Sequence, residues 1–345
     1  MAEDSSTCEH TGVAPCRSSD IDDKDTGVPT LPEHIVAVDP STRAVFARAM
    51  RIANASCTVL ITGETGTGKE ILAQIIHGYS PRRHQPFVPV NCGGLPEALV
   101  ESELFGYRKG AFTGALSDKL GLAEAADGGV LFLDEIGEMA LPAQAHLLRF
   151  LDTGQIVRLG DTHARSVSVR VIAATNRNVE RDVERGSIRR DLFYRLRGVP
   201  LHIPPLRERP EDIRALAGHF LRRCASQSGH PVKVPSEDAW TWLHEYPWPG
   251  NVRELKHVIQ AATAMSTGST ITRLDLIEAI GLARGAWVQA PGLDDDADER
   301  QRVTAALESA RGNRTHAAKA LGIGRTTLWR SLRRLGIAPE TIGRK

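Results

Sequence analysis

A glycine-rich segment with a lysine near its end is the feature of the sequence whose spacing most clearly predicts chemistry. It fits the pattern GxxxxGK, follows an apolar run and opens a helical pattern: Gly63, Glu64, Thr65, Gly66, Thr67, Gly68, Lys69 and Glu70. In this setting backbone N–H groups converge on phosphate oxygens, and Lys69 reaches the terminal phosphates of a nucleotide. The alternative is a glycine-rich turn without a ligand. Glu70 departs from the general pattern, because a hydroxyl residue normally stands there and assists Mg²⁺.

Acidic and amide residues end three further apolar runs, where buried strands are expected to stop: Asp134 with Glu135, Asn91, and Thr175 with Asn176. The carboxyl ends of parallel strands share one edge of a sheet, so these groups are expected beside the glycine-rich segment. We predict that Asp134 acts on Mg²⁺ and its water, and that Glu135 polarises the attacking water. The amides would hold water or the γ-phosphate. The alternatives are solvated acids and turn-forming asparagines.

Three arginines are candidates for charge neutralisation during phosphoryl transfer. Arg189 and Arg195 lie six residues apart before the last apolar run, and Arg253 follows Trp-Pro-Gly-Asn-Val near a helix start. A nucleotide site often receives an arginine from a neighbouring subunit, which neutralises charge that develops on the γ-phosphate. Arg253 is placed to report the nucleotide state. Surface salt bridges are the alternative for all three.

The elements that must position these residues follow from the apolar pattern. Five runs between residues 31 and 205 are nearly all apolar, as strands buried on both faces should be: Val59–Thr62, Phe87–Asn91, Val130–Asp134, Val169–Thr175 and Val199–Ile203. The helical patterns between them predict right-handed crossovers and a doubly wound α/β domain with a parallel sheet. Residues 206–284 predict four helices, at 211–225, 236–245, 251–265 and 273–280. An acidic leader (1–30) and an acidic linker (285–298) are polar, and the leader is predicted to be disordered.

A six-residue segment carries the most specific signal in the chain: Gly110, Ala111, Phe112, Thr113, Gly114 and Ala115. The two glycines allow the backbone to turn tightly around an exposed Phe-Thr tip. An exposed Phe is normally avoided, so a partner that buries it is a reasonable inference; the alternative is a Phe that folds back into the core. With this GAFTGA loop, residues 34–284 strongly resemble the AAA+ activators of sigma-54 RNA polymerase, the bacterial enhancer-binding proteins.

The resemblance implies roles for the residues above. Residues 63–70 would be the Walker A loop, in which the family also carries an acid at position 70. Asp134 and Glu135 would be the Walker B pair, with Asn91 the switch partner of Glu135. Thr175 and Asn176 would form the first sensor, Arg253 the second sensor, and the arginine pair the arginine fingers. It implies an AAA+ fold with a helical lid, ATP and Mg²⁺ as cofactors, a ring that is usually hexameric, and sigma-54 RNA polymerase holoenzyme as partner. Arg108 departs from the pattern, because many relatives carry an acid at this base of the GAFTGA loop; any salt bridge that this acid makes is in doubt here.

The last segment, residues 299–345, predicts a small all-α helix-turn-helix domain. It holds eleven basic and three acidic residues, whereas residues 1–25 hold seven acidic and two basic. Thr315–Leu321 and Arg325–Leu335 predict two helices around a Gly-Ile-Gly turn. Leucines form a buried stripe on the second helix, which leaves polar and basic residues facing a DNA groove: Arg325, Thr326, Thr327, Arg330, Arg333 and Arg334. The domain resembles the Fis-type module of these activators, which implies enhancer DNA as a partner; a basic surface helix is the alternative.

Composition excludes several classes of protein. No apolar run is long enough for a transmembrane helix and the N-terminus is not a signal peptide, so neither membrane insertion nor secretion is predicted. Five scattered cysteines predict neither a disulfide framework nor a zinc site, and a reducing cytoplasm is the default.

Two hypotheses follow for function. The first is an ATP-driven activator of sigma-54 transcription. Its leader is too short for a receiver domain, so a separate regulatory protein, a co-activator or expression level is expected to control it. The second is a DNA-binding AAA+ regulator that acts independently of sigma-54 and uses ATP to assemble. The intact GAFTGA loop favours the first.

Overall fold

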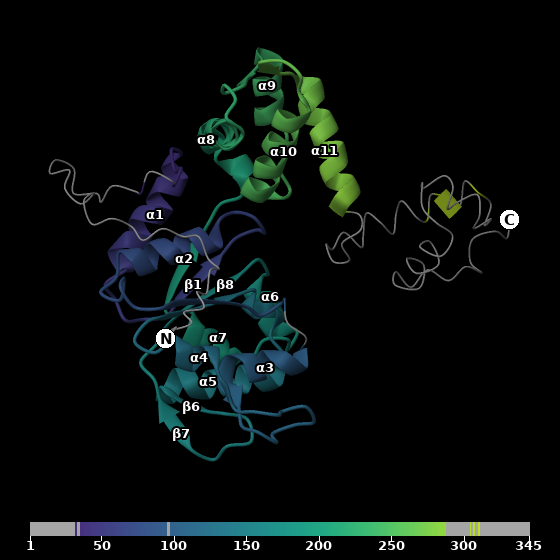
Figure 1. Ribbon diagram of the computed structural model, residues 1–345. Helices are drawn as coiled ribbons and strands as arrows, with labels where there is room; N and C mark the ends of the chain where they lie inside the picture. Colours follow the sequence, from purple (N-terminus) through teal and green to yellow (C-terminus); the bar gives the residue numbers. More distant parts are fainter. Residues whose placement is uncertain are drawn as a thin grey trace, which may run out of the picture. The chain divides into compact units, whose positions relative to one another are not determined.

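Figure 1 shows the computed structural model, which describes residues 35–94 and 97–287 together with Pro32, Thr304, Ala306, Leu307 and Ala310. The chain divides into two units, residues 1–283 and 284–345, and nearly all of the described residues belong to the first. The predicted leader and the predicted DNA-contacting residues lie outside the described residues: Arg325, Thr326, Thr327, Arg330, Arg333 and Arg334.

A five-stranded parallel sheet forms the centre of the first unit. Its strands stand in the order β2-β5-β8-β1-β9, with the bounds β1 Val59–Thr62, β2 Phe87–Asn91, β5 Val130–Asp134, β8 Arg170–Thr175 and β9 Val199–His202. Each predicted strand is present, to within one residue at either end. In register, Asn91 lies opposite Asp134, and Thr62 lies opposite Thr175. The polar residues that end these strands therefore share one edge of the sheet, as predicted.

Helices cover both faces of this sheet, which explains why its strands are apolar along their whole length. On β5, Val130 and Phe132 join one core cluster, and Leu131 and Leu133 join the other. The first cluster packs against α1 and α2, and the second against α3, α5 and α7 (Figure 1). The helices of this α/β part are α1 Pro40–Ile52, α2 Lys69–Gly78, α3 Glu97–Phe105, α4 Leu122–Ala125, α5 Leu141–Thr153, α6 Val179–Glu184 and α7 Arg190–Leu196, with a 3₁₀ turn η1 at Ile136–Glu138.

Two short hairpins project from this framework and were not predicted. The first joins β3 (Gly106–Tyr107) to β4 (Lys119–Leu120), and the second joins β6 (Gln155–Val157) to β7 (Ala164–Ser166). The GAFTGA loop connects the strands of the first hairpin. A bridge between Tyr107 and Leu159 ties the first hairpin to the turn of the second. The second hairpin therefore supports the hairpin that contains the GAFTGA loop.

Residues 206–287, here called the lid, form a helical subdomain with its own core of residues from all four helices. They comprise η2 Leu206–Glu208, α8 Pro210–Ser228, β10 Val234–Pro235, α9 Glu237–Glu245, α10 Asn251–Met265, β11 Thr270–Ile271 and α11 Arg273–Trp287. Proline suits the first position of α8, where no N–H donor is needed, and Gly229 ends that helix in the left-handed conformation. Helix α11 continues to Trp287, past the predicted end at residue 280. In the described part of the chain, no helix is long and apolar enough to cross a membrane.

Candidate functional site

The phosphate loop is the turn of residues 63–68 between β1 and α2. Gly66 has a φ of +80°, and a Cβ at this position would lie 2.3 Å from the carbonyl oxygen of Gly250 in the lid. Only glycine fits both the backbone conformation and this close approach. Gly68 is also left-handed and directly precedes Lys69, the first residue of α2. The unpaired N–H groups of the first helical turn therefore lie at the end of the loop, where they favour an anion.

The Lys69 ammonium joins the phosphate loop to the predicted catalytic acid. Its side chain is 6% exposed, and Nζ donates to the carbonyl oxygen of Gly63 at 3.1 Å. Nζ also lies 3.6 Å from Oε1 of Glu135. The other carboxylate oxygen of Glu135 accepts a hydrogen bond from the backbone N–H of Asn176, whose side-chain amide donates to Thr65 Oγ1 at 2.8 Å. Residues from three separated segments thus meet around one lysine, as the strand order predicted.

The remaining strand-end residues have more local partners. Asp134 Oδ1 accepts a hydrogen bond from the N–H of Glu135. Thr175 is buried, and its carbonyl oxygen accepts the N–H of Gly63 at 3.3 Å. Asn91 Oδ1 accepts the N–H groups of Gly93 and Gly94, which is the geometry of a turn-forming asparagine. The hydrogen bonds of Asn91 that the structure describes are therefore those of a turn-forming residue, the alternative to a role at the nucleotide.

Two side chains near the phosphate loop differ in their accessibility. Glu70 is exposed and accepts a hydrogen bond from Gln74, one turn further along α2. Cys92 follows Asn91 and is buried. Burial and the nearby carboxylates of Asp134 and Glu135 raise the pKa of its thiol to about 12. Cys92 is therefore a neutral, packed side chain and no nucleophile.

Lid residues hold the phosphate loop, and sequence reasoning missed most of them. Arg207 forms an ion pair with Glu64 at 2.6 Å, and this pairing lowers the pKa of Glu64 despite its partial burial. Asn251 and Arg209 donate to backbone carbonyls of the loop. Arg253 is exposed, and its Cβ would lie 3.1 Å from a Cβ at Gly66. No local signal in the sequence pointed to these contacts.

The GAFTGA loop is a compact turn. The N–H of Gly110 donates to the carbonyl oxygen of Ala115 at 2.9 Å, and the N–H of Ala115 donates to Phe112. Gly110 and Gly114 both have positive φ values. The Phe112 side chain is 41% exposed, and its ring packs edge-on against Tyr107 with centroids 4.9 Å apart. Thr113 is exposed, so the tip presents one aromatic ring and one hydroxyl group, together with Leu116, which is 85% exposed.

Comparisons with known proteins agree with this geometry. Residues 35–202 match the Sigma-54 interaction domain, residues 207–290 match the AAA+ ATPase lid domain, and residues 297–335 match the Bacterial regulatory protein, Fis family. Regulatory protein AtoC of Escherichia coli is 42% identical over 318 residues, which cover 90% of this chain and 69% of AtoC. The chain belongs to the sigma-54-dependent transcriptional activators.

Two further relatives show how much of such an activator the chain spans. The Nif-specific regulatory protein of Azotobacter vinelandii is 46% identical over 295 residues, which cover 84% of this chain and 56% of that protein. The crystal structure of NtrX from Brucella abortus in complex with ATP superposes with a TM-score of 0.67 at 32% identity, covering 88% of this chain and 70% of NtrX. The chain therefore spans about half the length of the Nif-specific relatives that it matches.

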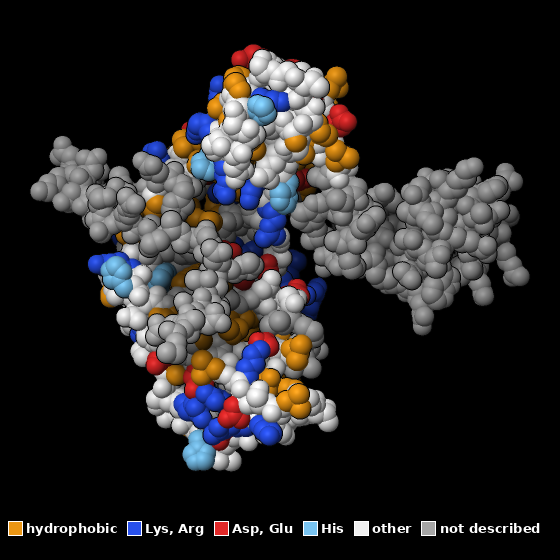
Figure 2. All heavy atoms as spheres, viewed as in Figure 1, with side chains coloured by type: hydrophobic (Ala, Val, Ile, Leu, Met, Phe, Trp, Pro, Cys, Tyr) orange, Lys and Arg blue, Asp and Glu red, His pale blue; other side chains and the backbone are white. Residues whose placement is uncertain are grey.

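At the base of the GAFTGA loop, Arg108 forms salt bridges of its own. Its guanidinium pairs with Asp118 on the same hairpin and with Asp161 on the β6–β7 hairpin, the latter at 3.0 Å. Arg165 extends the network to Glu124. Figure 2 shows acidic and basic side chains intermingled in the region where Figure 1 labels β6 and β7. The base of the loop is therefore held by ion pairs of Arg108 with carboxylates of two hairpins.

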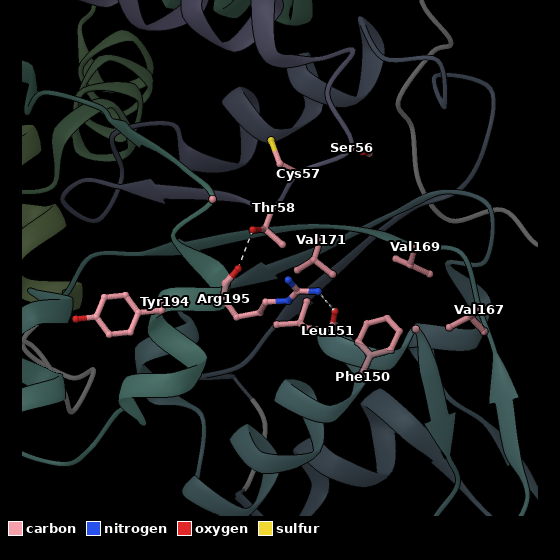
Figure 3. Close-up of a pocket in the computed structure, with 12 residues that line it drawn as sticks. Ser56, Cys57, Thr58, Phe150, Leu151, Val167, Val169, Val171, Tyr194 and Arg195 are labelled. Carbon is pink, nitrogen blue, oxygen red and sulfur yellow. Dashed lines mark hydrogen bonds between the residues drawn. The ribbon is translucent and has the colours of Figure 1, made fainter.

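Each of the two predicted arginine fingers forms an ion pair within the chain. Arg195 lines a cavity of about 400 Å³, pairs with Asp152 at 3.1 Å, and accepts a hydrogen bond at its carbonyl oxygen from Thr58 (Figure 3). Thr58 precedes β1, whereas the phosphate loop follows it, and the four residues of β1 span about 13 Å. Arg189 is exposed and forms a two-pronged ion pair with Asp191, which lowers the pKa of that carboxyl to about 2.

Proposed function

We propose that this protein is an ATP-hydrolysing transcription activator that binds upstream enhancer DNA and remodels sigma-54 RNA polymerase holoenzyme, so that open promoter complexes form. One observation carries the proposal: a single folded unit holds both the Lys69–Glu135 contact beside the phosphate loop and an exposed GAFTGA loop at the end of a braced hairpin. A nucleotide site alone would support many functions. The exposed GAFTGA loop favours one of these functions, the remodelling of sigma-54 RNA polymerase holoenzyme.

The residues around Lys69 support hydrolysis of ATP. Lys69 would bind the terminal phosphates, and Glu135, held by Asn176, would accept a proton from the attacking water. Thr175 and Asn176 would sense the γ-phosphate, and Asn91 would act on Glu135 by leaving its turn. Mg²⁺ typically binds through one or two carboxylates and keeps several waters, which fits Asp134 as its protein ligand. When bound, this ion would neutralise phosphate charge, and Glu70 would belong to the nucleotide-binding loop.

The arginines support an assembled form. Both arginines are exposed. Arg189 directly precedes α7, and Arg195 lies on α7 beyond the amino end of β1, away from its own phosphate loop. In a homo-oligomer, a ring of six in this proposal, they would enter the nucleotide site of a neighbour and neutralise charge there. Arg253, beside Gly66, would report the nucleotide state to the lid. ATP would thus bind between subunits.

The proposed DNA contacts fall on residues outside those that the structure describes. The Fis-family match at residues 297–335 supports contacts of Arg325 and its neighbours with an enhancer site. We place the protein in the cytoplasm, without a membrane partner. A separate regulatory protein or co-activator would set its activity.

The decisive experiment separates ATP hydrolysis from the formation of open promoter complexes. Thr113→Ala should retain ATP hydrolysis and lose open-complex formation on a sigma-54 promoter, because the tip and not the phosphate site changes. Thr241→Ala makes the same chemical change on an exposed face of α9 and should alter neither. Equal loss of both activities in Thr113→Ala would contradict the role of the loop. Full activation at promoters that do not need sigma-54 would favour the second candidate, a regulator independent of this factor.

A second experiment tests the phosphate site. Lys69→Ala should abolish ATP binding or hydrolysis, because no other described cation lies within the phosphate loop to replace its ammonium. Filter binding or calorimetry with a non-hydrolysable ATP analogue measures this. Retained hydrolysis would refute the phosphate site.

A further inference from the structure

Four consecutive residues of the phosphate loop, from Glu64 to Thr67, accept hydrogen bonds from the lid. Asn251 Nδ2 donates to the Glu64 carboxylate at 3.1 Å and to the carbonyl oxygen of Thr65 at 3.0 Å. The N–H of Val252 donates to the carbonyl oxygen of Gly66 at 3.0 Å. These partners are more than 180 residues apart in the chain. The lid therefore contacts the carboxylate of Glu64 and the backbone carbonyls of the residues that follow it.

Arg209 completes this strip. Its Nη2 donates to the carbonyl oxygen of Thr67 at 2.9 Å, and the bond is buried. A carbonyl oxygen and the N–H of the next residue point in opposite directions across a trans peptide. A donor that holds the carbonyl of Thr65 or Thr67 therefore also fixes the direction of the N–H that follows it. Those N–H groups belong to Gly66 and Gly68, the glycines of the GxxxxGK pattern.

The lid donors are themselves held rigidly. Asn251 is fully buried with a φ of +50°, and its Oδ1 accepts the N–H of Leu206 at 2.7 Å. Its amide thus uses both donor positions and its acceptor at once. Trp248, three residues earlier, is also buried with a positive φ, and its indole N–H donates to Leu243. Positive φ values in residues other than glycine persist only where the surroundings enforce them.

We propose that Asn251 and Arg209 are positioning residues for the nucleotide, through which the lid sets the direction of the phosphate-binding N–H groups and so the affinity for ATP. The inference rests on the proposed ATP-binding function and adds residues to it. Lid docking and nucleotide affinity are then linked, and the linkage is reciprocal. A lid that shifts on α10 would loosen the loop, and bound ATP would hold the lid in place.

Asn251→Asp tests the proposal with almost no change in volume. It puts a carboxylate oxygen where the amide donated. The carbonyl oxygen of Thr65 then faces another acceptor, and the carboxylate of Glu64 faces a like charge. We expect the dissociation constant of a non-hydrolysable ATP analogue to rise by about 10- to 100-fold, as for a buried acceptor left without its donor. The rate at saturating ATP should change by less than about threefold, because Lys69 and Glu135 are untouched. If Asn251 had a purely structural role, the substitution would not raise the dissociation constant while leaving the rate at saturating ATP nearly unchanged.

Two further variants make the outcome decisive. Gln227→Glu adds the same charge on an exposed part of α8 and should bind the analogue like the wild type. Arg209→Lys keeps the positive charge near Asp212 but lacks the second nitrogen that reaches Thr67, so it should weaken binding while folding is preserved. It also keeps the proposal testable if Asn251→Asp does not fold.

Amide hydrogen exchange provides the reciprocal measurement. The analogue should slow exchange at Val252, whose N–H lies in the lid and bonds to Gly66. Wild-type affinity in both Asn251→Asp and Arg209→Lys, with Lys69→Ala unable to bind, would overturn this inference alone. Binding by Lys69→Ala would instead overturn the proposed function on which it rests.

Discussion

The buried carboxylate of Asp212 offers the sharpest test of how the N-terminal segment is attached to the lid. This residue lies in the first turn of α8 and is fully buried. It accepts the backbone N–H groups of Val38 and Asp39 at 2.7 and 2.9 Å, and the hydroxyl of Thr42 at 2.5 Å. It also pairs with the buried guanidinium of Arg209 at 3.6 Å. We predict that Asp212→Asn destabilises the protein strongly, although it removes no volume.

The magnitude follows from the charge that the substitution leaves behind. Removal of one partner of a buried ion pair costs about 3–5 kcal/mol, because the other charge remains in the interior without compensation. Burial already lowers the pKa of Arg209, and Asp39 is a second carboxylate that counters this effect. We therefore expect the lower end of the range, about 3 kcal/mol. For a unit of this size the melting temperature should fall by about 6–12 °C.

Urea denaturation followed by tryptophan fluorescence measures this change, because Trp248 lies in the lid core. Glu245→Gln removes the same charge from an exposed position at the end of α9 and should stay within about 0.5 kcal/mol of the wild type. If Asp212→Asn lost less than about 1 kcal/mol, the Arg209 charge would have another source of compensation. The account of the buried pair would then be wrong.

Three other predictions address the loops. Gly66→Ala should destabilise the nucleotide-free protein by about 1–3 kcal/mol more than Gly229→Ala, since both are left-handed but only Gly66 meets lid backbone; denaturant titration measures the difference. Cys92 should stay unmodified by iodoacetamide at pH 9 while the partly exposed Cys57 reacts, because a pKa near 12 keeps the Cys92 thiol neutral; peptide mass spectrometry reports both, and equal labelling would contradict its burial. Arg108→Ala should speed chymotrypsin cleavage in the GAFTGA loop, because two carboxylates lose their shared partner; an unchanged rate would show that backbone bonds alone hold the loop base.

The sequence was sufficient for the framework of the sheet and for the edge where the site lies. On β5, a run of apolar residues ends in Asp134, and such a run is typical of a strand covered on both faces. The crossover rule then brings the ends of β1, β5 and β8 together, so the proximity of Lys69, Glu135 and Asn176 could be predicted. These inferences need only local pattern and one topological rule.

Other features left no local signal. Strands β3 and β4 have two residues each, which is too short for an alternating pattern to appear. The partner of Glu64 is Arg207, 143 residues later, and nothing beside either residue specifies the pair. The sequence did mark Arg108 as unusual. Its two carboxylate partners lie on separate hairpins, and only the folded arrangement brings them together.

Gln144 shows how such unpredicted residues connect the predicted ones. It is fully buried on α5, the helix that follows the strand of Asp134 and Glu135. Its amide donates to the carbonyl oxygens of Met139 and Ser187, both at 2.8 Å, and its oxygen accepts the N–H of Arg189 at 2.9 Å. A neutral amide supplies the two donors and one acceptor that this position requires, whereas a carboxylate or a lysine would leave a carbonyl or an N–H unpaired. The segment after Glu135 and the start of helix α7 are thus held by one side chain. Sequence motifs identify the residues with chemical roles, whereas buried residues such as Gln144 fix the segments that carry those residues relative to one another.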